Sequence, residues 1–179
     1  HFRHTARLTD PNTPTVSSAI GTVAVEWQGP AGDYPFEHLA FENVKIEGHG
    51  FGFTGARDTA DLRFRRCVFT ALFEPGGEGA RVSAILTEAN GLLLEENVFY
   101  RIQHPDLPGV TTMSWMSHTA YVGAGARDVV ARGNIIIKAT EGTMQRAGGI
   151  YERNVAAFTR VGVQFGQANG VTPTPDGVI

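Results

Sequence analysis

One short pattern recurs five times along the sequence. An apolar strand ends in two polar residues, one asparagine (once a cysteine) follows, and a second apolar strand begins. The fullest copy is residues 91–102, Gly-Leu-Leu-Leu-Glu-Glu-Asn-Val-Phe-Tyr-Arg-Ile. The copies align on a column of five residues: Asn43, Cys67, Asn97, Asn134 and Asn154. Neighbouring members are 24, 30, 37 and 20 residues apart. Repeats of this length built from short strands are typical of solenoids, in which each repeat packs only against its neighbours.

Asparagine suits this column for two physical reasons. Each coil must bend sharply between two strands, and asparagine tolerates the left-handed backbone region that such a bend needs. Equivalent residues of stacked parallel strands lie about 4.8 Å apart, so asparagine amides can hydrogen-bond from coil to coil as a ladder. The unequal spacings then indicate that some coils carry projecting loops. The alternative is an antiparallel sandwich with asparagine in ordinary turns.

The pattern resembles the right-handed parallel β-helix proteins of the pectate-lyase-like superfamily, over about residues 36–168. The resemblance is carried by residues 118–122 (His-Thr-Ala-Tyr-Val), 128–136 (Asp-Val-Val-Ala-Arg-Gly-Asn-Ile-Ile), 142–149 (Gly-Thr-Met-Gln-Arg-Ala-Gly-Gly) and 152–154 (Glu-Arg-Asn). It implies an all-β fold, a right-handed parallel β-helix solenoid of about five coils. The superfamily includes polysaccharide lyases, glycoside hydrolases and phage tailspikes. It therefore implies an extracellular or virion-surface protein without selecting a reaction.

The sequence divides into three segments. Residues 1–34 are expected to be a lead-in with one strand at residues 19–27, residues 35–170 the parallel β-helix, and residues 171–179 a loop or linker. A third strand is expected after each asparagine-centred pair, at residues 50–54, 81–87, 118–122, 143–146 and 162–165. No amphipathic cap helix is evident at either end. Because open solenoid ends expose strand edges and apolar core, we expect the chain to be part of a longer polypeptide.

Composition argues against several partners and sites. The 179 residues carry a formal net charge of −3, which does not favour nucleic acid, and no apolar run approaches the length of a membrane span. The single Cys67 excludes an internal disulfide and is expected to be a buried substitute for asparagine. The histidines lack zinc-site spacing. We expect no metal or other cofactor; calcium stays open for a calcium-dependent lyase, but the sequence shows no cluster of carboxylates to bind it.

The third sheet, together with the loop at residues 103–117, is the candidate site. A solenoid offers a long sheet face that loops can wall into a groove, which suits a linear polysaccharide better than a small molecule. The catalytic candidates are His118, Tyr121 and Arg146. The substrate-binding candidates are His104, Trp115, Arg101 and Gln164.

These candidates fit the chemistry of a uronate lyase. β-Elimination needs a base that takes the proton next to a carboxylate, and a group that neutralises this carboxylate. We expect His118 and Tyr121 as base and acid, with Arg146 or Arg101 as the neutralising group. Residues three apart on a flat strand face opposite sides, so His118 and Tyr121 share a face only if a bulge or turn intervenes. Each candidate also has a structural alternative: a hydrogen-bonded histidine, an outward arginine ion pair, and Trp115 as an anchor for its loop.

Two functions remain open at this stage. The first is a carbohydrate-active β-helix that binds or cleaves an acidic polysaccharide. A lyase is favoured over a hydrolase, because Glu88 and Glu141, which flank third-sheet strands, occupy opposite strand ends. The second is a non-catalytic solenoid of a tailspike, fibre or surface-attachment protein, forming a homotrimer along an apolar outward stripe. Candidate members of such a stripe are Phe51, Phe53, Phe73 and Tyr100.

Overall fold

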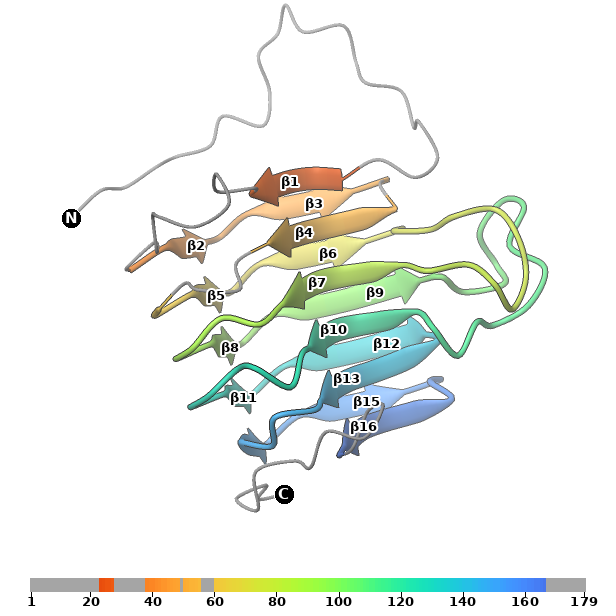
Figure 1. Cartoon of the computed structure of the whole chain (residues 1–179). Helices are drawn as coiled ribbons and strands as arrows, with labels where there is room; N and C mark the ends of the chain where they lie inside the picture. Colours follow the sequence, from red (N-terminus) through yellow and green to blue (C-terminus); the bar gives the residue numbers. More distant parts are fainter. Residues whose placement is uncertain (1–22, 28–37, 49, 56–59, 167–179) are drawn as a thin grey trace, which may run out of the picture.

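The computed structural model describes residues 23–27, 38–48, 50–55 and 60–166. Within these ranges the chain forms sixteen β-strands and no helix, so none is present there that could cross a membrane (Figure 1). Successive strands belong to three sheets in turn, and the coils stack so that equivalent strands pair in parallel. The expected all-β parallel β-helix of about five coils is confirmed. Most of the lead-in and all of residues 171–179 lie outside the described residues.

Each coil contributes one strand to each sheet. The first sheet contains β2 (Ala40–Glu42), β5 (Arg63–Arg65), β8 (Leu93–Glu95), β11 (Val130–Arg132) and β14 (Ile150–Glu152). The second sheet contains β3 (Lys45–Glu47), β6 (Val68–Thr70), β9 (Val98–Ile102), β12 (Ile135–Ala139) and β15 (Val155–Ala157). The third sheet contains β1 (Val23–Trp27), β4 (Phe51–Gly55), β7 (Ser83–Thr87), β10 (His118–Val122), β13 (Glu141–Gln145) and β16 (Val161–Phe165). The strand expected at residues 19–27 is β1, which pairs in parallel with β4 and so extends the third sheet.

The asparagine ladder is present at the corner between the first and second sheets. Asn97 Oδ1 accepts a hydrogen bond from the backbone N–H of Cys67 at 2.9 Å. Asn134 Oδ1 in turn accepts from the backbone N–H and the side-chain amide of Asn97, at 2.9 and 3.0 Å. Asn154 Oδ1 accepts from Asn134 in the same way. Each asparagine amide also donates to a backbone carbonyl of the preceding coil. The ladder therefore ties four successive coils together.

Two details of the predicted column are wrong. The register of β2 with β5 and of β3 with β6 places Val44, rather than Asn43, opposite Cys67. The left-handed residue of the bend is also one position earlier than the ladder. It is Asn43 in the first coil and Glu96, with φ of 55°, in the third. The ladder position thus selects asparagine for its hydrogen bonds and not for its backbone tolerance.

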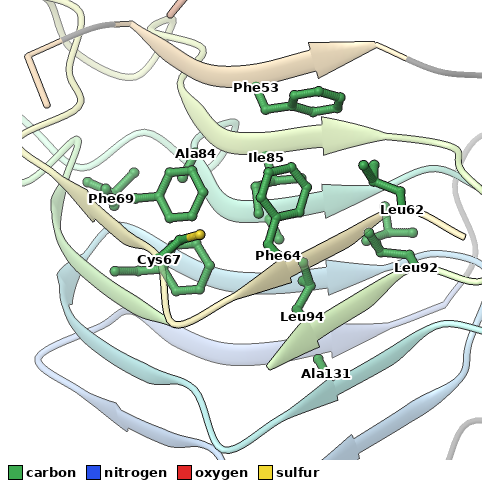
Figure 2. Packing of buried hydrophobic residues seen from close by; sticks show 14 of the residues in the cluster. Phe53, Leu62, Phe64, Cys67, Phe69, Ala84, Ile85, Leu92, Leu94 and Ala131 are labelled. Atoms are coloured by element: carbon green, nitrogen blue, oxygen red, sulfur yellow. The ribbon is translucent and has the colours of Figure 1, made fainter. Parts of the chain in front are cut away.

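Stacked apolar side chains fill the interior. The rings of Phe41 and Phe64 stack with centroids 4.9 Å apart, and those of Phe69 and Phe99 with centroids 5.1 Å apart. Phe53 packs edge-on against Phe64, so it belongs to the core and not to an outward stripe. Figure 2 shows the thiol of Cys67 among these rings. Burial raises the pKa of this thiol, in keeping with a structural role.

A column of alternating charges runs along the outer face of the first sheet. Its members, from β2 to β14, are Glu42, Arg65, Glu95, Arg132 and Glu152. Glu95 is central: Arg65 Nε lies 2.5 Å from one of its carboxylate oxygens, and Arg132 Nε lies 2.6 Å from the other. Burial raises the pKa of Glu95, but the two guanidinium groups outweigh this and leave the pKa below its usual value. Each coil thus presents the charge opposite to that of its neighbour.

Candidate functional site

The strands of the third sheet contain a break in their alternation, and this break creates the candidate site. The ladder pairing of β10 with both neighbours skips Thr119, and that of β7 skips Ala84. Ala84 and Ile85 are consecutive, yet both lie in the apolar core (Figure 2). Two successive inward residues shift the alternation by one position. Residues on either side of the break, such as His118 and Tyr121, therefore reach the same outer face although they are three apart in sequence.

The three catalytic candidates converge on this face. The rings of His118 and Tyr121 are in edge contact, with centroids 5.3 Å apart. Arg146, directly after β13, places its guanidinium carbon 5.2 Å from the centroid of the Tyr121 ring. A cation over an aromatic face at this distance contributes about 0.5–2 kcal/mol, depending on its exposure to water. This break brings His118 and Tyr121 together, and it is not a bulge, because the neighbouring strands each skip one residue at the level of Thr119.

His118 is the most buried of the three. It is 4% exposed, whereas Tyr121 and Arg146 are half-buried. The pKa of His118 is lowered to about 4, chiefly by burial and in addition by the positive charge of Arg146, while the nearby backbone of Met116 opposes the shift. At neutral pH the imidazole is therefore uncharged and has a lone pair with which it can take a proton. Neither ring nitrogen has a hydrogen-bond partner among the described residues.

Gln164 lies on the same outer face. The register places Leu86, Tyr121, Met144 and Gln164 in one column across four strands. Neighbouring members are about 4.8 Å apart, so Gln164 stands two strands from Tyr121, with Met144 between them. This column provides an apolar surface with a polar amide at one end.

Two carboxylates flank the third-sheet strands at opposite ends. Glu141 is the first residue of β13 and pairs in register with His118. Glu88 follows β7 at the other end, where its side chain lies across Gly123: a Cβ on that glycine would come within 2.3 Å of Glu88 Cγ. Their separation along the strands does not suit a pair of hydrolytic carboxylates facing one sugar bond. Among the described residues, no cluster of three or more histidine, cysteine or acidic side chains has the geometry of a metal site.

Arg101 and His104 form a separate cluster, centred on Asp106. Arg101 Nε lies 3.2 Å and His104 Nδ1 2.9 Å from Asp106 Oδ1, and Lys138 Nζ lies 3.0 Å from Oδ2. Arg101 and Lys138 both have left-handed backbones, with φ of 58° and 54°. They occupy neighbouring coils at the corner where the second sheet ends. The structure thus places Arg101 and His104 in contact with the carboxylate of Asp106 on the loop, in a different cluster from Arg146.

Acidification is expected to release the loop held by Asp106. Burial raises the pKa of this carboxyl, but hydrogen bonds from Lys138, His104 and Arg101 outweigh it and lower the pKa to about 2. A folded-state pKa below the unfolded value stabilises the loop above about pH 4, and this stabilisation is lost as the pH falls toward about 2. Fluorescence of Trp115, measured in a Trp27→Phe background, reports on the loop. An Asp106→Asn variant should lack the transition in this window; an identical transition in that variant would exclude Asp106 as its cause.

Two projecting loops stack beside the start of β7 and β10 (Figure 1). Residues 71–82 and 103–117 are joined by backbone hydrogen bonds of Gly76 with Gly109 and Thr111, each 3.0 Å long. The fully buried Gln103 bonds both the N–H and the carbonyl of Glu74, each at 2.8 Å. Trp115, on the longer loop, is 56% exposed. These hydrogen bonds hold the two loops together, while the indole of Trp115 stays accessible to a ligand.

Sequence reasoning missed or undervalued several members of these clusters. Asp106 and Lys138 were not predicted, and Glu141 was considered only as the partner of Glu88. The pairing of Glu141 with His118 has a sequence signal, because both residues begin a third strand. Aligning the third strands by their first residue, rather than by the asparagine column alone, brings the two together.

No family model matches the sequence, no curated protein matches it, and no solved structure matches it. The fold therefore rests on strand order, register and the asparagine ladder.

Proposed function

We propose that this chain is a carbohydrate-active β-helix that binds an acidic polysaccharide across the outer face of the third sheet and cleaves it by β-elimination. The convergence of His118, Tyr121 and Arg146 on one face is the observation that carries the proposal. The pattern of residues 36–168, which resembles the pectate-lyase-like β-helix proteins, agrees with this assignment.

Each of the three residues has a distinct role in the proposed reaction. The neutral imidazole of His118 takes the proton at C5 of a uronate, next to the carboxylate. Arg146 stabilises the negative charge that develops on this carboxylate. The electron pair of the broken C–H bond forms a C4–C5 double bond, the C4–O bond breaks, and the phenol of Tyr121 protonates the departing sugar oxygen. Because His118 is 4% exposed, the side chains that bury its ring must move before the substrate reaches it.

The remaining candidates have binding roles in this proposal. Gln164 and the exposed indole of Trp115 lie on the third sheet and on the adjoining loop. An indole face stacks on a sugar ring by burying apolar surface on both partners. Arg101 and His104 would contact the polymer beside the loop, where the guanidinium of Arg101 can bind one of its carboxylates.

Ultraviolet absorbance of the unsaturated uronate product tests the proposal directly. The native protein is incubated with a panel of uronate polymers, beside Arg146→Ala and a matched control, Arg153→Ala, whose exposed side chain lies at the corner between the first and second sheets. We expect product from the native protein and from Arg153→Ala, and a rate about a hundredfold lower from Arg146→Ala, since loss of one charge-stabilising donor typically has that effect. Equal rates for the two arginine variants would exclude the assigned role of Arg146.

One observation favours a second function, that of a non-catalytic structural solenoid. Apolar side chains line the outer face of the second sheet, including Ile135, Val155 and Tyr100, and Phe158 just after β15 is 75% exposed. Such a stripe suits association of copies along the solenoid, as in the trimeric tailspike or fibre of a virion surface. If no polymer yields product, and sedimentation shows a trimer that Val155→Glu dissociates, this second function replaces the first.

A further inference from the structure

A buried acid–base pair lies at the start of β10 and β13. His118 and Glu141 are register partners on these neighbouring strands. His118 Nε2 lies 3.4 Å from Glu141 Oε2, and each side chain is only 5% exposed. Among the described residues, Glu141 is the one carboxylate with an oxygen within 4 Å of a nitrogen of this ring. A titratable pair so close and so buried changes its charge as a unit.

The two side chains are close, but the nitrogens of His118 lack hydrogen bonds. Neither nitrogen of His118 meets the geometry of a hydrogen bond with any described residue. Leaving a buried polar group without a partner typically costs about 1–3 kcal/mol. Catalytic hydrogen bonds are often long or misaligned before substrate binds and shorten afterwards. This geometry fits a pair in which the hydrogen bond between His118 and Glu141 forms when the imidazole is charged or a ligand is bound.

The other charged or titratable groups around the pair do not replace Glu141. Arg146, after β13, and Arg160, before β16, are cations that act on His118 and Glu141 respectively. Tyr121, on the strand of His118, contacts the ring by its edge. The equivalent position on β7 is Ser83, which is uncharged. Arg146 thus destabilises a positive charge on His118. Glu141 is the residue whose negative charge can stabilise it.

We propose that Glu141 is a positioning residue for His118: its carboxylate orients the ring and stabilises the imidazolium that forms when His118 takes a proton. This inference rests on the proposed function for its role in catalysis, but the pairing itself does not. Glu141 forms and breaks no covalent bond. The substrate proton stays on His118, next to the carboxylate, until it is lost to water after the product leaves, and the Tyr121 phenolate regains a proton from water in the same stage.

Titration of the imidazole tests the pairing without any substrate. The signal of His118, one of six histidines, is assigned by its loss in His118→Gln and followed by NMR against pH. Removal of the carboxylate by Glu141→Gln should lower the pH at which the His118 ring takes up a proton by at least about one unit, since an opposite charge this close favours the imidazolium; burial raises the pKa of Glu141, so the two groups of the native pair titrate together. Glu141→Asp should restore part of the difference, and Glu152→Gln, on the first sheet, should leave the native value. An unchanged pKa in Glu141→Gln would overturn the proposal.

A second measurement uses the native protein and does not depend on how the variants fold. The side-chain carboxyl carbon of Glu141 is followed by NMR through the same pH range. A paired carboxyl should respond in two steps, one of them coincident with the titration of His118. A single step that ignores His118 would also overturn the pairing.

Activity separates this inference from the proposed function. If uronate polymers are cleaved, Glu141→Gln should move the acidic limb of the kcat/KM profile to lower pH and lower kcat about tenfold, with KM little changed. Cleavage with an unmoved acidic limb would overturn the role of Glu141 and leave the lyase intact. A pKa of His118 that depends on Glu141, in a protein that cleaves nothing, would support the pairing and refute the lyase.

Discussion

Replacing Asn97 with alanine is expected to lower the free energy of unfolding by about 3–5 kcal/mol. Asn97 is fully buried, and its side chain joins three coils. Its Oδ1 accepts from the Cys67 N–H, and its Nδ2 donates to the Phe64 carbonyl and to Asn134 Oδ1. Alanine would remove these hydrogen bonds from a fully buried site, at about 1–3 kcal/mol for each group that finds no new partner. It would also open a cavity between coils.

The matched control lies in the same ladder. Cys67 occupies the ladder position one coil earlier, and its thiol, a weak donor, lies 3.3 and 3.4 Å from two backbone carbonyl oxygens. Cys67→Ala should therefore destabilise by only about 1 kcal/mol. Urea unfolding followed by circular dichroism gives both values. Equal losses in the two variants would show that the asparagine hydrogen bonds add little beyond apolar packing.

Gly142→Ala is expected to separate β16 from β13 at the C-terminal end of the described solenoid. A Cβ at this position would lie 1.8 Å from the carbonyl oxygen of Gly162 and 3.1 Å from that of Val161. These are backbone atoms, held in place because β13 and β16 pair on both sides of Gly142. The overlap cannot be relieved by rotating a side chain, so we expect a loss of about 3 kcal/mol or more.

Hydrogen exchange localises this effect. Amides of β16 should lose protection in Gly142→Ala, while those of β7 keep it, because coils that are not adjacent share no contacts. Gly79→Ala is the matched control, since a Cβ there meets nothing within 4 Å; it should change stability by no more than about 0.5 kcal/mol. Native protection of β16 in Gly142→Ala would mean that the two strands can move apart without cost.

The asparagine column predicted the coils because its hydrogen bonds need one residue type at one place in each turn. The same reasoning misplaced the column in the first coil, where Glu42 and Asn43 imitate the pattern although Val44 fills the ladder position. Sequence alone does not distinguish an asparagine that bonds along a ladder from one that turns the chain. Backbone register decides between them.

The site was predictable in its residues and not in its geometry. His118, Tyr121 and Arg146 were identified by chemical type, but their meeting depends on the skipped position at Thr119. That position is Gly52, Ala84, Thr119, Gly142 and Gly162 in successive coils. A column of mostly small residues is a signal that is visible only after the coils are aligned. The Asp106 cluster was beyond prediction, because it depends on the path of a loop whose length differs between coils.

The alternating charges along the first sheet restrict how the number of coils in such a protein can change during evolution. Each coil from Glu42 to Glu152 carries the sign opposite to its neighbour's. Duplication of a single coil would set two like charges about 4.8 Å apart, in a column where Glu95 now holds an arginine on each side. Duplication of two coils would preserve the alternation. Lengthening of this solenoid by duplication, and shortening of it by deletion, should therefore proceed in pairs of coils.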